Sequence, residues 1–210
     1  VIREFGNRDI TGMSRLPIPN IKFRINASPE KRRNIEDYEV SPAGIALIKQ
    51  FEGFSTQPYR CSAGAWTIGY GQTIPEGQTD HVSKAQAETL LRSKIAGTYA
   101  PEVQRLVSVP LYQGEFDALV SLNYNIGAKV LCDPTKDIRN SGRPIELIPL
   151  LNASRYEAAS LEFSKFTKGG AENLYYRGLL KRRIAEMFVF RDHAEIPSTL
   201  APDVAAYCND

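Results

Sequence analysis

The sequence predicts an α+β fold that is mainly helical, with one small antiparallel sheet near the start of its organised part. Two observations support this prediction. After residue 41, apolar residues recur at intervals of three and four over several segments, which is the pattern of amphipathic helices. Between the first two of these segments, residues 54–74 carry a proline and several glycines around short runs of β-forming residues, as short strands joined by tight turns do.

The first helix is predicted to begin after Ser41. A serine side chain can cap the free amides of a first turn, and Pro42 suits the first helical position. An apolar stripe then runs through Ile48, and Gly53 supplies an end. Glu52 lies four residues after Ile48, so we expect its carboxyl beside this stripe, on the buried side of the last turn.

The remaining helices follow from capping signals and apolar spacing. Ser83 and Gln86 have the spacing of a capping box and open a helix that we expect to end near Gly97. Three more amphipathic helices are expected, around residues 116–123, over 155–166 and around 180–188. By contrast, residues 131–149 contain a glycine and three prolines, which predicts a long irregular loop.

The two ends of the chain differ in composition from its middle. Residues 1–40 mix glycine, proline and scattered charges, with at most one short strand, so we expect an N-terminal arm or linker. Residues 41–191 then form the folded domain, and 192–210 form an acidic tail without lysine or arginine. No apolar run is long enough to span a membrane, and no secretory signal is visible. The chain begins with valine, as a processed chain or an excised fragment would.

Cysteine and histidine are too few and too scattered to favour metal or disulfide chemistry. Cys61, Cys132 and Cys208 lie far apart, and the two histidines have no acid or thiol at a helical interval. We therefore expect no metal site and no cofactor, although Cys61 could pair with one of the other cysteines. Basic residues gather in 1–33 and 165–191, where they form either a solvated face or a surface for polyanions such as the bacterial wall. Nucleic acid is not an expected partner.

One acid, one thiol and one hydroxyl are candidates for chemistry. Cys61 follows Glu52 by nine positions and Thr67 follows Cys61 by six, so the end of a helix and the adjoining sheet can bring the three together across a cleft. This spacing alone is weak evidence. The neighbouring residues are more specific: Ile48 to Phe54, Pro58 with Tyr59, Trp66 to Thr73, Phe116 to Ser121, Asn125 to Gly127, and Gly178 to Glu186.

Taken together, these motifs closely resemble the phage-type lysozymes of glycoside hydrolase family 24, over roughly residues 41–190. The resemblance implies a two-lobed lysozyme-like fold, with a small sheet-bearing lobe and a larger helical lobe on either side of a glycan cleft. It also implies hydrolysis of the β-1,4 bond between N-acetylmuramic acid and N-acetylglucosamine. Glu52 would then be the general acid, Cys61 its base or nucleophile, and Thr67 the group that positions water. Gln72 stands where many members carry histidine.

Physical chemistry agrees with the role that the resemblance gives Glu52. An apolar surface disfavours a charged carboxylate, so such a glutamate stays protonated and can donate a proton to the leaving oxygen. The alternative is an ordinary ion pair, and Arg182 is the arginine most suited to approach Glu52, where it would also orient it. Tyr70 is expected in the core or the cleft wall. Asn123 and Asn125 either bind N-acetyl groups or cap a helix end.

Several functional readings stay open. The protein is a phage or prophage endolysin, or the lysozyme domain of a delivered antibacterial effector or tail protein; in the second case an inhibitor protein is a possible partner. It is expected to be a monomer that is made in the cytoplasm and acts on peptidoglycan in the periplasm or cell wall. The alternatives are a non-catalytic peptidoglycan-binding module with the same fold, and a lytic transglycosylase.

Overall fold

The computed structural model describes residues 31–61, 64–132, 145–169, 174–175 and 177–192. Its elements in chain order are η1 (Ile35–Asp37), α1 (Pro42–Glu52), β1 (Ser55–Arg60), β2 (Trp66–Gly69), β3 (Gln72–Thr73), α2 (Lys84–Lys94), η2 (Ile95–Tyr99), α3 (Ala100–Leu106), α4 (Gln113–Ile126), α5 (Ala128–Cys132), α6 (Leu147–Asn152), α7 (Tyr156–Glu162), η3 (Phe163–Lys165), β4 (Lys168–Gly169), β5 (Leu174–Tyr175) and α8 (Arg177–Asp192).

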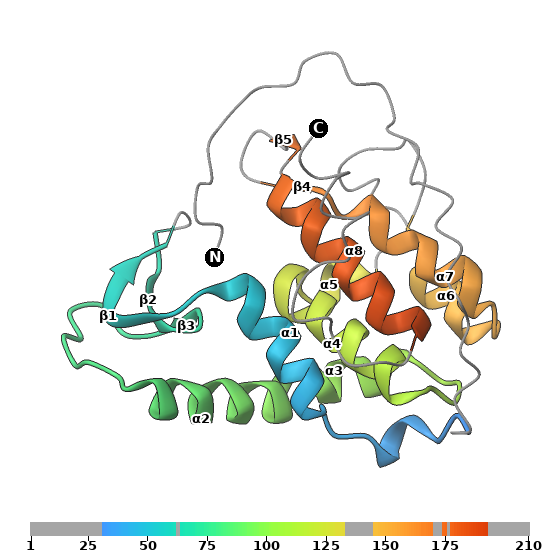
Figure 1. The fold of residues 1–210 in the computed structure, drawn as a ribbon, viewed down its shortest axis with the longest axis horizontal. Helices are drawn as coiled ribbons and strands as arrows, with labels where there is room; N and C mark the ends of the chain where they lie inside the picture. Colours follow the sequence, from blue (N-terminus) through green and yellow to red (C-terminus); the bar gives the residue numbers. More distant parts are fainter. Residues whose placement is uncertain (1–30, 62–63, 133–144, 170–173, 176, 193–210) are drawn as a thin grey trace.

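The predicted α+β fold class is confirmed. Strands β1, β2 and β3 form an antiparallel sheet in that order, and Figure 1 shows this sheet set apart from the larger group of helices. Helix α4 lies at the centre of that group, where it packs against α1, α3 and α8. Every residue of α4 from Gly114 to Asn123 is buried, including the polar side chains of Glu115, Asp117, Ser121 and Asn123. No helix among the described residues combines the length and apolar character that crossing a membrane requires.

Helix α1 has the predicted boundaries. The Ser41 side chain accepts a hydrogen bond of 3.1 Å from the Gly44 amide, and Pro42 occupies the first helical position. The helix ends at Gly53, whose φ of 68° lies in the region that favours glycine. The last helical residue is Glu52, and it is buried as expected, with 6% of its surface exposed. Local sequence signals therefore fix where this residue sits on its helix.

The prediction that the second helix ends near Gly97 is wrong. The capping box of Ser83 and Gln86 is present, but α2 continues through the π-helix η2 directly into α3. In η2 the amide of Ala100 bonds the carbonyl of Ile95, five residues earlier. A wider turn of this kind accommodates the ring of Pro101, which would otherwise press on the preceding turn of a regular helix. Glycine here does not end the helix, since Gly97 keeps a helical conformation.

The prediction of an irregular loop over residues 131–149 is also wrong, at both ends of that range. Helix α5 extends to Cys132, and α6 begins at Leu147; residues 133–144 lie outside the described part. Pro149 occupies the first turn of α6, where a backbone N–H has no helical acceptor and its loss costs little. The short hairpin of β4 and β5 was not predicted.

Residues 31–40, the end of the predicted arm, pack against the helices. Arg33 exchanges backbone hydrogen bonds of 2.8 and 2.9 Å with Leu111, and the side chains of Ile35 and Tyr38 are buried. The guanidinium of Arg32 reaches the start of α4. The short strand suggested for the N-terminal arm, at Ile18 to Ile25, and the acidic tail after Asp192 lie outside the described residues. The division of the chain into arm, domain and tail therefore stays a prediction.

Candidate active site

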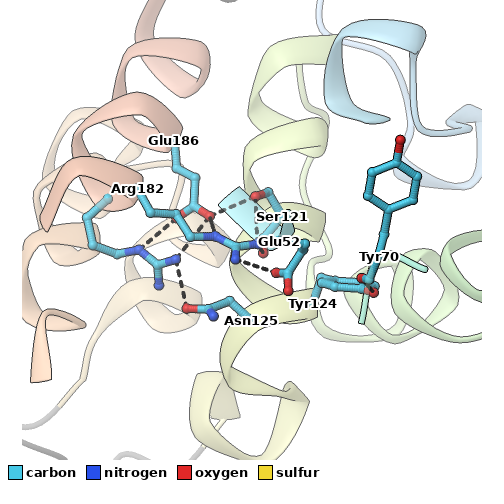
Figure 2. A network of polar contacts seen from close by, with 8 residues as sticks. Glu52, Tyr70, Ser121, Tyr124, Asn125, Arg182 and Glu186 are labelled. Atoms are coloured by element: carbon cyan, nitrogen blue, oxygen red, sulfur yellow. Dashed lines mark hydrogen bonds and ion pairs between the residues drawn. The ribbon is translucent and has the colours of Figure 1, made fainter. Parts of the chain in front are cut away.

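Glu52 and Arg182 meet at the junction of α1 and α8. The carboxyl oxygen Oε1 of Glu52 lies 2.5 Å from Nη1 of Arg182, and both side chains are nearly fully buried (3% and 4% exposed). Figure 2 shows this pair with α4 close by. The 130 positions between the two residues in the chain mean that only the packing of α8 against α1 and α4 creates this contact.

Arg182 belongs to a larger buried network on α8. Its Nε donates to Oε1 of Glu186 at 3.0 Å, and its Nη2 donates to the backbone carbonyl of Ser121 at 3.1 Å. The Ser121 hydroxyl donates to the same Glu186 oxygen at 2.7 Å. Nη2 of Arg183 lies 3.0 Å from the same Oε1 of Glu186 and 3.0 Å from Oδ1 of Asn125. Glu186 therefore joins two arginines and α4 (Figure 2).

The charges of this network change how the surroundings of Glu52 must be described. The sequence argument expected an apolar setting for its carboxyl, whereas the structure places the guanidinium of Arg182 against it. Burial opposes the charge of Arg182, but the carboxylates of Glu52 and Glu186 outweigh burial and raise its pKa. Arg183 receives less compensation, so burial lowers its pKa to about 10. Both guanidinium groups therefore stay charged at neutral pH.

A small hollow of about 90 Å³ opens beside Glu52, between the sheet and the helices. Its walls are formed by Glu52, Gly71, Thr73, Lys94, Tyr99, Tyr124 and Asn125. The rings of Tyr99 and Tyr124 lie 4.7 Å apart, and the Tyr124 hydroxyl donates to the backbone carbonyl of Tyr70 at 2.9 Å. Burial, with a contribution from the nearby Glu52, raises the pKa of Tyr124, so its phenol stays a neutral donor. The lining is polar and suits a hydroxyl-rich ligand.

The strand register places Thr67 on the face of the sheet that carries Thr73. Thr67 pairs directly with Thr73 on β3 and with Tyr59 on β1, and directly paired residues project to the same face. Because Thr73 lines the hollow, this is the face towards Glu52. Thr67 is buried (2% exposed), and its hydroxyl donates to the Ala65 carbonyl at 3.1 Å.

Cys61 lies directly after β1, in the turn between β1 and β2. Cys61 is half-buried, and its amide donates to the Ala65 carbonyl at 2.9 Å. Cys61 follows Tyr59 by two positions, the interval at which side chains of an extended chain project to one face. The structure therefore groups Cys61 and Thr67 on one small hairpin. Cys208 and the side chain of Cys132 lie outside the described part, so pairing with Cys61 stays untested there.

The other predicted site residues divide into two groups. Asn125 lines the hollow beside Glu52. Asn123 is fully buried, and its amide nitrogen donates to the Tyr99 carbonyl at 3.1 Å and to Glu102 at 2.9 Å, so it links α4 to the preceding helices instead of facing the hollow. This position does not support the contact with N-acetyl groups that we considered for Asn123.

Tyr70 has a structural setting. Only 3% of it is exposed, its ring packs 5.3 Å from that of Phe54, and the Lys49 ammonium lies 5.4 Å from its centre. Gln72 accepts a hydrogen bond of 2.8 Å from the Tyr70 amide and so closes the turn between β2 and β3. The glutamine thus maintains the local backbone of this turn.

Sequence reasoning gave no role to Glu186, Ser121 or Thr73. The available signal for Glu186 was its spacing, since it follows Arg182 by four positions and Arg183 by three, which places all three on one side of a helix. For Thr73 no signal was present in the sequence, because its place beside the hollow depends on how β3 pairs with β2. Within the described ranges, no group of three or more His, Cys, Asp or Glu side chains is arranged to hold a metal ion.

Comparison with known proteins gives consistent matches. A family model described as phage lysozyme matches residues 49–186. The endolysin of Acyrthosiphon pisum secondary endosymbiont phage 1 is 37% identical over 153 residues, which is 72% of this chain and 97% of that protein. The endolysin of Bacillus phage B103 is also 37% identical, over 157 residues, but the chain spans only 53% of its length. The solved muramidase domain of SpmX from Asticaccaulis excentricus superposes with a TM-score of 0.62 and 30% identity, covering 73% of this chain and 97% of that domain.

Proposed function

The chain belongs to the phage lysozyme family, and from this premise we propose that it is a muramidase in which Glu52 is the general acid. The substrate is peptidoglycan, and the bond cut is the β-1,4 linkage between N-acetylmuramic acid and N-acetylglucosamine. The observation that carries the proposal is a buried carboxyl at the end of α1 that also lines an open, polar hollow between sheet and helices.

Glycosidic cleavage requires a proton on the leaving oxygen, and Glu52 is the carboxyl in the described hollow. A positioned acid of this kind contributes on the order of 10²–10⁴-fold in rate. Arg182 holds one oxygen of Glu52 and so fixes the orientation of the carboxyl. Asn125, Tyr99 and Lys94 offer amide, phenol and ammonium donors to the sugar from the helical side of the hollow.

The second half of the reaction is assigned to the hairpin. Cys61 acts as a base towards water, which gives inversion at the anomeric carbon, and Thr67 holds that water. Support comes from the register, because Thr67 shares a sheet face with the hollow-lining Thr73 and Cys61 sits on the same hairpin. Direct attack by the thiolate would instead give retention, and both routes use the same residues.

The biological setting follows from the reaction. The protein acts on the cell wall as a phage or prophage endolysin, or as the lysozyme domain of a delivered effector or tail protein. We propose that it works as a monomer, with an inhibitor protein as a partner in the second case. Residues 1–40 and 192–210 flank the lysozyme domain as an N-terminal arm, of which residues 31–40 pack on the helices, and an acidic tail.

Product analysis tests the proposal. Digestion of purified sacculi should release fragments with reducing N-acetylmuramic acid ends, whereas a lytic transglycosylase releases 1,6-anhydro ends, and mass spectrometry separates the two. Absence of soluble products, with retained binding to sacculi, would instead identify a non-catalytic wall-binding module. Proton NMR of the fresh product anomer then distinguishes the water route from thiolate attack.

Variants of Cys61 test the role of the thiol. Cys61→Ser should lose most activity, while Cys61→Asp should retain much of it, because aspartate supplies a ready carboxylate base. Activity in Cys61→Ser equal to that of the unmodified protein would show that the thiol takes no part in the reaction. Unfolding midpoints of both variants serve as the control for folding.

A further inference from the structure

We propose that Glu186 is a positioning residue for Glu52: it holds Arg182 in place and offsets its charge, so that Glu52 can take up the proton that it donates to the glycan. This inference rests on the proposed role of Glu52 as general acid. It concerns a side chain that is completely buried and has no contact with the hollow.

The geometry gives Glu186 control over Arg182. The guanidinium of Arg182 has three kinds of partner, namely Glu52, Glu186 and the Ser121 carbonyl, and Ser121 in turn donates to Glu186. Two partners other than Glu52 thereby hold Arg182, namely Glu186 and Ser121. The planar guanidinium has a fixed fork of donors, so fixing two of its sides fixes the direction of the third. Without Glu186, Ser121 would be left to hold the far side of Arg182, through its carbonyl and its hydroxyl.

The charge count explains why a second carboxylate is required. With Glu52 ionised, two guanidinium groups face two carboxylates, and the buried network is neutral. When Glu52 takes up its proton, Glu186 becomes the partner of both Arg182 and Arg183. Without Glu186, two buried cations would oppose protonation of Glu52, and in a medium of low dielectric their effect would be large.

Other groups face Glu52 as well, and none replaces Glu186. Lys94 at the end of α2 adds a cation to the hollow, and Tyr99 and Tyr124 add neutral phenols. Thr73 on β3 contributes no charge. Among these described neighbours of Glu52 and Arg182, Glu186 is the carboxylate that offsets the arginines.

A purely structural role for Glu186 is the competing explanation. A buried carboxylate between two arginines also ties α8 to α4, and removing one member of such a network commonly costs about 3–5 kcal/mol of folding free energy. That role affects stability and the amount of folded enzyme. It does not change the pH at which the folded enzyme loses its acid, so the pH profile separates the two explanations.

The test measures kcat/KM against pH on a soluble glycan fragment of peptidoglycan. Glu186→Gln should move the alkaline limb to lower pH by about one unit, the order expected when one charge is removed beside a buried carboxyl. Arg183→Gln removes a cation from the same network and should move that limb to higher pH. Arg183→Lys keeps the charge and should restore the original profile.

Arg191→Gln is the matched control. It removes one positive charge from the same helix, but nine residues beyond Arg182, which is about 13 Å along a helix, where Arg191 pairs with Glu157. Its alkaline limb should not move. Shifts of opposite sign for Glu186→Gln and Arg183→Gln, with none for Arg191→Gln, support the proposal.

If the alkaline limb of the kcat/KM pH profile stays in place in both Glu186→Gln and Arg183→Gln, the proposal is overturned. If Glu186→Gln does not fold, the comparison of Arg183→Gln with Arg183→Lys decides by itself. Glu52→Gln distinguishes an error about Glu52 from an error about Glu186. If this variant remains fully active, the assignment of Glu52 as the acid is wrong. If it is inactive while the limbs of the other variants stay in place, only the role of Glu186 is wrong.

Discussion

Replacing Arg32 by alanine tests whether residues 31–40 belong to the folded domain. The Arg32 guanidinium makes two hydrogen bonds to Glu115, of 3.1 and 2.7 Å, at the start of α4. It also lies 4.3 Å from the ring centre of Tyr112 and 3.7 Å from that of Tyr156, so it is stacked against two aromatic rings. One side chain therefore connects the N-terminal segment to both α4 and α7.

The expected loss follows from these contacts. Hydrogen bonds between charged groups contribute about 1.5–3 kcal/mol, and each cation–π contact at a partly exposed site about 0.5–1 kcal/mol. Glu115 is 2% exposed, but it still accepts the Tyr112 amide at 2.8 Å after the substitution, which limits the cost of leaving it unpaired. We expect Arg32→Ala to lower the free energy of unfolding by about 3 kcal/mol, which corresponds to roughly 6–12 °C in Tm for a domain of this size.

Urea unfolding monitored by circular dichroism measures this loss, and Arg33→Ala is the matched control. Arg33 lies 4.3 Å from the Tyr38 ring centre and makes one exposed hydrogen bond of 3.3 Å to Gln113, so its removal should cost at most about 1 kcal/mol. If Arg32→Ala is no more destabilised than Arg33→Ala, the reasoning about this segment is refuted.

Two further predictions concern stability. In Gly44→Ala the new Cβ would lie 2.7 Å from Asp117 and from Val40, so we expect a loss of about 1–3 kcal/mol. Gly97→Ala meets no atom within 4 Å and should be neutral or stabilising by up to about 1 kcal/mol in the same urea assay. Equal effects of the two substitutions would contradict the close approach of α1 and α4. Burial raises the pKa of Asp117, so the fold favours its protonated form, and stability is lost as pH rises above the ordinary value of about 3.9. The stability of Asp117→Asn relative to the unmodified protein should therefore rise with pH above that value and stay constant below it; a difference independent of pH would refute this.

Capping residues and apolar spacing predicted helix boundaries wherever neighbouring residues in the chain determine them. The boundaries of α1 follow from a capping serine, a proline and a glycine that are neighbours in the chain, and the structure has the predicted helix. The continuation of α2 through Gly97 could not be predicted in this way, because a glycine stop and a helical glycine look alike in sequence. Here the π-helix η2, which precedes Pro101, decides between them.

Prediction of the candidate active site from the sequence has the same limit. The burial of Glu52 could be predicted from its spacing along α1, but its ion pair depends on Arg182, which comes from the last helix. Sequence reasoning identified Arg182 as the arginine to consider and still expected an apolar setting, since it had no means to place Glu186 and Arg183 behind it. Buried charges depend on contacts between distant segments, and helix periodicity alone does not reveal them.

The most direct test of the account is the activity of Glu52→Gln. Glutamine keeps the shape of the side chain and can still accept a hydrogen bond from Arg182, but it has no proton to donate to a glycosidic oxygen. Release of reducing ends from sacculi should fall by about 10²-fold or more while the circular dichroism spectrum of the protein is unchanged. Undiminished release by a folded Glu52→Gln protein would contradict the account.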